Sequence, residues 1–346
     1  MSGRIRVLLV DDSAFARKVV RDVLSGEPDI EVVGIARDGI DALEKIQQLK
    51  PDVVTLDLMM PELDGLGLLN AMADWPDRPH AVVVTTLDEA SDAGLAALVA
   101  GAFELVQKPT PIASDRLYEV RPTLVAAVRA AGIAPRGARK KTEVAPVVIP
   151  GPGRAAFDLV VIGASTGGPQ AVSALLGALP ANFPVPIAVV VHMPPGYTAG
   201  YADRLDRESA LDVFEAREEL ELPPGRVAIA RAGMHLTLTD RRGSCHARLS
   251  SSPLDTLHRP SVDVLFASAA ALRGPRVLGV VLTGMGDDGV AGARAIRAQG
   301  GRIMAEAEST CVVYGMPRAV IENGLANDIV PLDGMAAAIA AALSHR

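Results

Sequence analysis

Residues 6–13 read Arg-Val-Leu-Leu-Val-Asp-Asp-Ser, and this stretch decides the fold of the first third of the chain. The apolar run that ends at Val10 is continuous rather than alternating, which is typical of a strand buried on both faces of a parallel sheet. Ser13 is a good N-cap for a helix over Ser13 to Ser25, because its hydroxyl can accept a hydrogen bond from a free amide of the first turn. The chain is therefore expected to open with a strand, an acidic turn and a helix.

The same unit repeats through the first 130 residues. Short runs rich in Val, Ile and Leu predict further strands at Glu31–Ala36, Val53–Leu56, Ala81–Val84 and Phe103–Val106. Helical patterns separate them, for example at Gly39–Leu49 and Ala90–Ala100. Buried strands that alternate with helices predict a doubly wound, five-stranded parallel sheet covered on both faces, and we place this domain at residues 1–130.

Residues 131–156 are interpreted as a flexible linker. They contain four prolines, several glycines and the basic residues Arg136, Arg139, Lys140 and Lys141, with little that would fill a core. A charge run of this kind can contact an acidic partner, but a solvated tether is the more common arrangement and the one we expect.

The alternation resumes at Phe157 and predicts a second domain over residues 157–346. Strands are expected at Asp158–Ile162, Ile187–Val191, Val227–Ala230, Val277–Leu282 and Arg302–Ala305, and helices at Gly168–Ala178, Val262–Leu272 and Val290–Ala298. Alternation from Met234 to Leu249 predicts an inserted hairpin. The fold class is α/β, with two doubly wound parallel-sheet domains of which the second is larger.

Composition excludes several classes of protein. The 346 residues suffice for two cores, and 34 Lys and Arg against 41 Asp and Glu give a formal charge of −7, which argues against nucleic acid as a partner. Cys245 and Cys311 have neither disulfide nor metal-ligand spacing. With no signal-peptide core and no apolar run of membrane-spanning length, we expect a cytoplasmic protein that is not embedded in a membrane.

Three acids follow predicted strands of the first domain. Asp11 and Asp12 end the first strand and Asp57 follows the third, and ligands of open parallel sheets lie beyond these carboxyl ends. Clustered carboxylates suit Mg²⁺, and an aspartate can carry a phosphoryl group. Lys108 after the fifth strand and a hydroxyl at Thr85 or Thr86 after the fourth would then hold phosphate oxygens. The alternative, that these acids are merely solvated loop residues, does not explain the complete set.

The first domain resembles the receiver domain of response regulators over residues 4–128. The resemblance rests on Val-Asp-Asp-Ser at 10–13, Asp57 with Met-Pro at 60–61 and Asp-Gly at 64–65, and Lys108-Pro109. It implies that Asp57 is the phosphoacceptor, that Asp11, Asp12 and Asp57 hold Mg²⁺ and that Lys108 binds phosphate. Of the two threonines we favour Thr85 as the switch residue. The chain departs from the family at Leu105, where an aromatic residue is usual.

A second constellation begins at Gly-Ala-Ser-Thr-Gly, residues 163–167, which is a G-x-S-x-G turn between a strand and a helix. Such a turn exposes the Ser165 hydroxyl beside free helix amides that suit an oxyanion. His192 and Asp288 also follow predicted strands, so a base and an orienting acid meet Ser165 at one sheet edge. This chain order differs from that of α/β-hydrolases, chymotrypsin and subtilisin.

Each member of this constellation has an alternative role. The glycine-rich turn is also typical of phosphate or cofactor loops, although G-x-G-x-x-G is lacking. His235, His246 and His258 are rivals to His192, but two fall in the hairpin and one in a loop. Asp288 could instead cap the helix that begins near Val290.

The second domain resembles the chemotaxis protein-glutamate methylesterases through nearly all of residues 157–345. The matching motifs are Gly-Ala-Ser-Thr-Gly-Gly-Pro at 163–169, Val-His-Met-Pro at 191–194, His-Arg-Pro-Ser-Val-Asp-Val-Leu-Phe at 258–266, Leu-Thr-Gly-Met-Gly-Asp-Asp-Gly at 282–289 and Val-Val-Tyr-Gly-Met-Pro at 312–317. The resemblance implies Ser165 as nucleophile, His192 as base and Asp288 as its orienting acid. Thr166 and Met285 would line the site, with the Met285 amide as an oxyanion donor.

The resemblance implies a phosphorylation-activated hydrolase that removes methyl esters from chemoreceptor glutamates, releases methanol and also deamidates receptor glutamines. It would serve chemotaxis adaptation, with methylated chemoreceptors as substrates, a chemotaxis histidine kinase as phosphodonor, Mg²⁺ in the receiver and no cofactor for the ester chemistry. The competing hypotheses are a non-catalytic regulator with a vestigial triad and an esterase that acts on a protein outside chemotaxis.

Overall fold

The computed structural model describes residues 3–86, 91–108, 120–134, 147 and 155–344. The chain divides into two compact units, Met1–Lys140 and Lys141–Arg346. Residues 135–146 and 148–154 of the predicted linker lie outside the described residues. Among the described helices, none is both long and apolar enough to cross a membrane.

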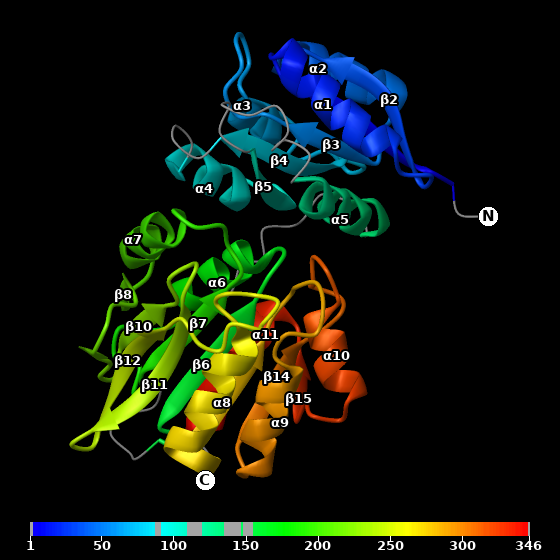
Figure 1. The fold of residues 1–346 in the computed structure, drawn as a ribbon. Helices are drawn as coiled ribbons and strands as arrows, with labels where there is room; N and C mark the ends of the chain where they lie inside the picture. The colour runs from blue at the N-terminus through cyan, green and yellow to red at the C-terminus, as the bar shows by residue number, and fades with distance from the viewer. Residues whose placement is uncertain (1–2, 87–90, 109–119, 135–146, 148–154, 345–346) are drawn as a thin grey trace. The chain divides into compact units, whose positions relative to one another are not determined.

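The first unit is a five-stranded parallel sheet with helices on both faces (Figure 1). Its elements are β1 (Ile5–Val10), α1 (Ala14–Ser25), β2 (Ile30–Ala36), α2 (Gly39–Leu49), β3 (Val53–Leu56), α3 (Gly65–Ala71), β4 (His80–Thr86), α4 (Ser91–Val99), β5 (Glu104–Lys108) and α5 (Arg121–Ile133). The strand order is β2-β1-β3-β4-β5. Helix α1 packs against α5, whereas α2, α3 and α4 follow one another in contact. The doubly wound fold is confirmed.

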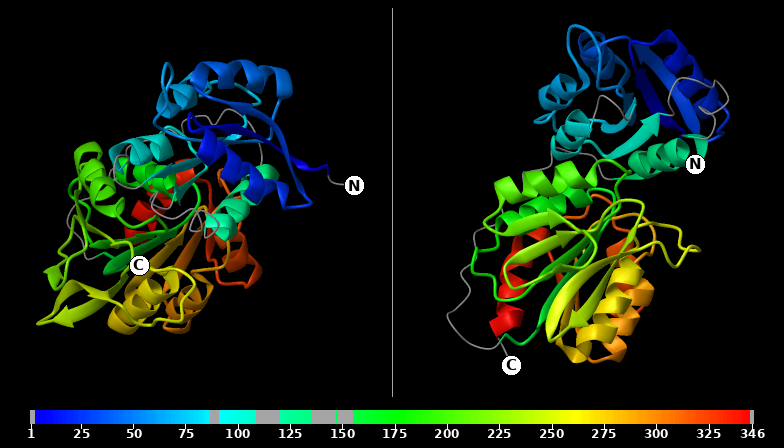
Figure 2. Two further views of the ribbon diagram at one scale, coloured as in Figure 1. Left: turned by 45° about the horizontal axis from the view of Figure 1, so that its top comes forward. Right: turned by 60° about the vertical axis from the view of Figure 1, so that its left-hand side comes forward.

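The second unit contains a larger parallel sheet of order β15-β14-β13-β6-β7-β10-β8 and a small antiparallel sheet. Its elements are β6 (Leu159–Ala164), α6 (Gly168–Gly177), β7 (Ile187–Val191), α7 (Thr198–Glu208), β8 (Asp212–Glu215), β9 (Leu220–Glu221), β10 (Arg226–Ile229), β11 (His235–Arg241), β12 (Ser244–Ser250), α8 (Val262–Arg273), η2 (Gly274–Arg276), β13 (Val277–Val281), α9 (Val290–Ala298), β14 (Arg302–Glu306), α10 (Met316–Glu322), β15 (Asp328–Val330) and α11 (Leu332–Ser344). Figures 1 and 2 show α8 and α9 on one face of the parallel sheet and α6 and α11 on the other.

The predicted strands of both units are present, and the structure adds short edge strands and helices such as α7 and α11, for which no range was predicted. The five strands predicted in each sheet are found, and the predicted hairpin is β11 and β12, to which β9 adds a third strand. Ser13 caps α1 as predicted, since its side chain accepts from the Ala16 amide. The edge strands β8 and β15 were not predicted, because their sequences, Asp-Val-Phe-Glu and Asp-Ile-Val, are short and begin with an acid.

The order of the strands in the second unit reverses between β6 and β13. From β6 the chain moves outward to β7 on one side, and it later returns to place β13 on the other side. Such a reversal of strand order is where ligands bind in open α/β sheets, outside the carboxyl ends of the strands. Ser165 follows β6 and Thr283 follows β13, so both lie at this switch point.

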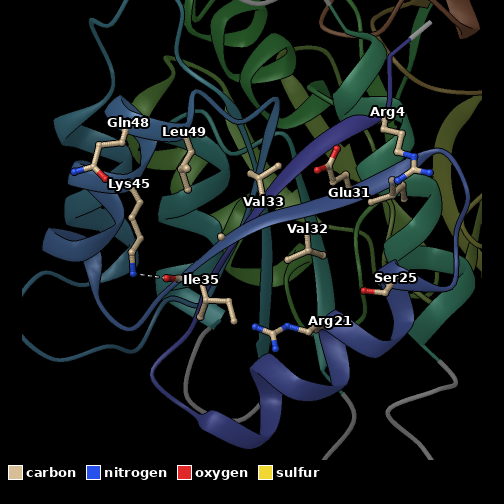
Figure 3. Close-up of a pocket in the computed structure, with 12 residues that line it drawn as sticks. Arg4, Arg21, Ser25, Glu31, Val32, Val33, Ile35, Lys45, Gln48 and Leu49 are labelled. Atoms are coloured by element: carbon tan, nitrogen blue, oxygen red, sulfur yellow. Dashed lines mark hydrogen bonds between the residues drawn. The ribbon is translucent and has the colours of Figure 1, made fainter. Parts of the chain in front are cut away.

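A groove of about 750 Å³ runs along the outer edge of β2 in the first unit (Figure 3). It is lined by the strand itself and by side chains of α1 and α2, among them Arg21 and Lys45. The Lys45 ammonium donates a hydrogen bond to the Ile35 carbonyl on this edge. A lysine placed there opposes pairing of the edge with another strand.

The core of the second unit supplies a test of this packing. Phe266 of α8 is fully buried among Ile296, Ile303 and other apolar side chains. We expect Phe266→Ala to lower the free energy of unfolding of this unit by about 3–5 kcal/mol, because the cavity adds to the lost burial. Urea unfolding measures the change, and Ile329→Ala, at an exposed position of β15, is the control. Equal small losses in both variants would contradict this description of the core.

Candidate active site and phosphorylation site

The predicted carboxylate cluster is present at the carboxyl ends of β1 and β3. Ligand oxygens of Asp11, Asp12 and Asp57 all lie within 4.8 Å of one another, so the three acids fit a shared divalent cation. Lys108 at the end of β5 places its ammonium 2.6 Å from Asp11 Oδ2 and 3.1 Å from Asp57 Oδ1. Asp11 and Asp57 are buried and Asp12 is exposed.

Burial raises the pKa of Asp57, which the nearby Lys108 ammonium counteracts and the Asp11 carboxylate reinforces. Thr85 is buried on β4 and pairs in register with Gln107, while Thr86 pairs with Lys108. The side chain of Thr86 and residue Pro109 lie outside the described parts, so the choice between the two threonines stays a prediction. Leu105 is buried within β5.

Ser165 lies on a sharp turn between β6 and α6. Gly167 has φ +77° and Gly168 donates its amide to the Ser165 carbonyl. A Cβ on Gly167 would come within 2.0 Å of Val312, so the turn requires glycine for both conformation and space. The Ser165 amide donates to the Thr283 carbonyl at 3.0 Å, which ties the turn to the segment after β13.

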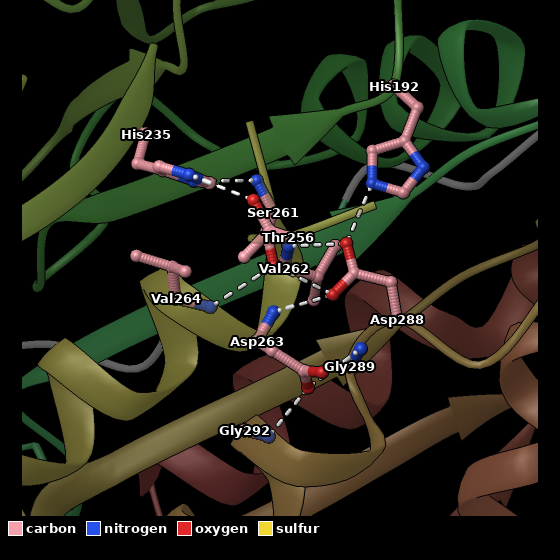
Figure 4. Close-up of polar contacts among 10 residues, drawn as sticks. All are labelled: His192, His235, Thr256, Ser261, Val262, Asp263, Val264, Asp288, Gly289 and Gly292. Carbon is pink, nitrogen blue, oxygen red and sulfur yellow. Dashed lines mark hydrogen bonds and ion pairs between the residues drawn. The ribbon is translucent and has the colours of Figure 1, made fainter. Parts of the chain in front are cut away.

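His192 is brought beside Ser165 by strand register. Ala164 at the end of β6 pairs with Val191 at the end of β7, and the His192 amide donates to the Ala164 carbonyl. The two side chains thus follow paired residues of adjacent strands. His192 Nε2 lies 2.9 Å from Asp288 Oδ2, whereas no hydrogen bond partner is found for its buried Nδ1 among the described residues (Figure 4).

The carboxylate of Asp288 receives four hydrogen bonds. Besides His192, the donors are the Ser261 hydroxyl and the Val262 and Asp263 amides, at 2.8–2.9 Å (Figure 4). Asp288 therefore holds amides at the start of α8. The alternative that it caps α9 is wrong, because the Gly289 and Gly292 amides donate to Asp263 instead.

These bonds control the charge of Asp288. Burial would by itself raise the pKa of this carboxyl, but the hydrogen bonds from His192 and from the Asp263 and Val262 amides outweigh burial and lower the pKa to about 2. An ionised Asp288 holds His192 with Nε2–H toward the acid, and in the neutral ring this places the lone pair on Nδ1.

Thr166 and Met285, which are expected to line the site, lie in and next to the turn that carries Ser165. Met285 is 46% exposed, and its amide has no acceptor among the described residues, so this amide is available to an oxyanion. Thr166 is buried, and its carbonyl accepts from the Thr283 hydroxyl at 3.0 Å. A Cβ on Gly284 would lie 2.7 Å from that of Ser165, so only glycine allows this approach.

The three rival histidines occupy different places. His246 contacts the Ser244 carbonyl in the hairpin, and fully buried His235 bonds to Pro253, Thr256 and Ser261. The His258 ring stacks on that of His192, with centroids 4.1 Å apart and planes 20° from parallel.

Sequence reasoning did not assign the supporting residues. Ser261 donates to Asp288 and Asp263 accepts from the amides at the start of α9, and both occur in the His-Arg-Pro-Ser-Val-Asp motif at residues 258–263. Thr283 was also missed, although its hydroxyl accepts from the Val312 and Val313 amides. The sequence signal for Ser261 and Asp263 was the motif at residues 258–263, because its polar residues had been given no role.

Comparison with known proteins finds a matching family for each unit. Residues 160–339 match the family model of the CheB methylesterase, and residues 7–120 match that of the response regulator receiver domain. The chain is 57% identical over 335 residues to protein-glutamate methylesterase/protein-glutamine glutaminase 5 of Myxococcus xanthus, covering 96% of each. It is 41% identical to the protein-glutamate methylesterase/protein-glutamine glutaminase of Thermotoga maritima, covering 94% of this chain and 95% of that one. The crystal structure of the Thermotoga maritima CheB methylesterase catalytic domain matches 54% of this chain and 98% of its own, with 42% identity and a TM-score of 0.52.

The carboxylate cluster predicts Mg²⁺ binding that depends on Asp57. We expect Asp57→Asn to weaken Mg²⁺ binding about tenfold or more, because it removes one of three clustered negative charges. Calorimetric titration of the full chain with Mg²⁺ measures the affinity. Asp22→Asn, at an exposed position of α1, should bind Mg²⁺ as the wild type does. Equal affinities for all three proteins would contradict a site at Asp57.

The lowered pKa of Asp288 predicts an acid-dependent contribution to stability. Because the pKa falls from 3.8 to about 2 on folding, the ionised carboxylate stabilises the fold above pH 4 by about 2 kcal/mol, and this contribution disappears as the pH falls to 2. The difference in unfolding free energy between wild type and Asp288→Asn should shrink by this amount between pH 5 and pH 2. Asp287→Asn, at the exposed neighbour, is the control for removing one carboxylate from the same turn.

Proposed function

Because this chain belongs to the CheB methylesterase family, with a response regulator receiver domain ahead of the esterase domain, we propose that it hydrolyses methyl esters of glutamate side chains on chemoreceptors. The relatives are named for this activity and for protein-glutamine glutaminase activity. The observation that carries the proposal is the hydrogen bond from His192 to Asp288, which leaves Nδ1 unpartnered beside the Ser165 turn.

In the proposed reaction, Ser165 Oγ attacks the ester carbonyl carbon while His192 Nδ1 takes the hydroxyl proton. The carbonyl oxygen becomes an oxyanion, to which the Met285 amide donates a hydrogen bond. Collapse breaks the bond to the methoxy oxygen, which takes the proton from His192 and leaves as methanol. Water, deprotonated by His192, then cleaves the acyl-enzyme and yields a glutamate carboxylate and free Ser165.

The same steps deamidate glutamine when ammonia leaves in place of methanol. The amide nitrogen takes its proton from His192, and the acyl-enzyme is identical to the one formed from the ester. Asp288 stays ionised throughout, because its low pKa keeps it from taking the proton of His192, and its charge stabilises the imidazolium that forms.

The proposed role of the first domain is control by phosphorylation at Asp57. Its carboxylate attacks the phosphorus of a phosphodonor, and a chemotaxis histidine kinase would be that donor in the cell. Asp11, Asp12 and Asp57 would hold Mg²⁺, which when bound offsets the charge of the phosphoryl oxygens. Lys108 lies 3.1 Å from Asp57 Oδ1 and would hold a remaining oxygen. The added charge then changes how the receiver acts on the esterase domain.

Methanol release from a methylated receptor fragment tests both parts of the proposal. Wild type should release methanol faster with Mg²⁺ and a small-molecule phosphodonor than without them. Ser165→Ala should lose about 10³-fold or more of the rate, and Asp57→Asn should keep a basal rate that ignores the phosphodonor. Ser209→Ala, at the end of α7, is the control for a serine away from the site.

The outcomes separate the competing functions. A folded wild-type chain that binds the fragment and releases no methanol would favour a non-catalytic binding role. Release that ignores the phosphodonor in the wild type would keep the esterase and overturn control by phosphorylation. Methanol release from a methylated protein outside chemotaxis, with none from the receptor fragment, would show that the substrate is not a chemoreceptor.

A further inference from the structure

We propose that His258 is a positioning residue of the esterase site, whose ring serves as a flat support that fixes the plane of the His192 imidazole. The two rings are 4.1 Å apart and nearly parallel, and both histidines are mostly buried. His258 comes from the segment between β12 and α8, so it reaches His192 from outside the parallel sheet. The inference rests on the proposed function, because it assigns His192 as the base.

His192 needs such a support because the bond to Asp288 restrains only one end of its ring. Nε2 lies nearer than Nδ1 to the axis of the Cβ–Cγ bond, so rotation about that bond displaces Nδ1 and turns its lone pair more than it displaces Nε2. The hydrogen bond to Asp288 alone therefore leaves the direction of the Nδ1 lone pair poorly fixed. A ring stacked face to face on the imidazole restricts this rotation, and so directs Nδ1 toward the reacting hydroxyl.

His258 is itself held by a buried anchor. His235 is fully buried and accepts the Ser261 amide at Nδ1 at 3.3 Å (Figure 4). Its Nε2 therefore carries the hydrogen and donates to the Pro253 carbonyl at 3.0 Å. Thr256 Oγ1 lies 3.2 Å from the same Nε2. The segment that carries His258 is thus fixed on both sides of that residue.

The far end of the segment is joined to the catalytic acid. The Ser261 hydroxyl donates to Asp288 Oδ1 at 2.9 Å, while Asp288 Oδ2 bonds to His192. The base is therefore held by one short stretch of chain in two ways, through its edge by Asp288 and through its face by His258. Because both restraints depend on this one segment, the Asp288 hydrogen bond and the His258 stack keep a constant position relative to each other.

The stack also has to tolerate the positive charge that His192 acquires during the reaction. The charged or titratable groups that face His258 are His192, Asp288 and Asp287. Burial lowers the pKa of His258 and the His192 charge lowers it further, while the Asp288 and Asp287 charges raise it; the net lowering favours a neutral His258 ring beside a charged His192. A neutral ring supports an imidazolium, whereas a second imidazolium would repel it.

The test compares a variant that keeps a flat ring with one that removes it. We expect His258→Ala to lower kcat for methanol release about tenfold to a hundredfold with KM changed less than about threefold, because the substrate contacts remain. His258→Phe should recover most of the lost kcat, and its pH profile should have the same acidic limb as wild type, because in this proposal the His258 ring acts by its shape and not by taking up a proton. His246→Ala is the matched control, because this histidine lies in the hairpin.

A second readout separates this inference from the substrate assignment. The rate at which a fluorophosphonate labels Ser165 reports the activated nucleophile without any receptor fragment, and it should fall in His258→Ala and recover in His258→Phe. If the fluorophosphonate labels wild-type Ser165 but the wild type releases no methanol, the receptor fragment is not the substrate. The labelling rates of the variants still decide the role of His258 in that case. An unchanged rate in a folded His258→Ala, or a His258→Phe as slow as His258→Ala, would overturn the proposal.

Discussion

The carboxylate of Asp288 is the point on which the second site depends. It follows β13, yet its hydrogen bonds reach His192 after β7 and the start of α8, so one side chain joins three segments. A buried charge is unfavourable unless its lone pairs are filled, and four donors fill them here. The hydrogen bonds that orient His192 are therefore among those that stabilise the buried Asp288 carboxylate.

Both units use the same structural principle for different chemistry. In each, a parallel sheet brings the carboxyl ends of neighbouring strands to one edge, and the residues just past those ends form the site. In the first unit these residues are acids with one lysine, which suit a cation and a phosphoryl group. In the second they are a serine, a histidine and an acid on glycine-rich turns, which suit attack on a carbonyl. The carboxyl edge of the sheet brings the side chains close together, and their chemical types determine which reaction they suit.

What the sequence could predict follows from this principle. Asp57, Ser165 and His192 were assigned because each directly follows an apolar strand, and strand ends of a parallel sheet converge whatever the loops do. Ser261 and His258 come from a loop whose course depends on His235, a buried histidine of β11 that lies 26 residues before Ser261, and no local pattern encodes such a contact. The edge strands β8 and β15 escaped prediction for a related reason, since short polar strands are stabilised by their neighbours more than by their own sequence.

The residues that support His192 are polar because the groups around them need hydrogen bonds. An apolar wall would also restrict an imidazole, but it would leave the amides at the start of α8 and the Asp288 oxygens without partners. Ser261 satisfies Asp288, Asp263 satisfies the first amides of α9, and His235 satisfies the Ser261 amide. Each polar group thus supplies a hydrogen bond that its neighbour needs, whereas His192 Nδ1 has no hydrogen bond partner among the described residues. Because Asp288 holds Nε2, Nδ1 keeps a lone pair that can accept a hydrogen.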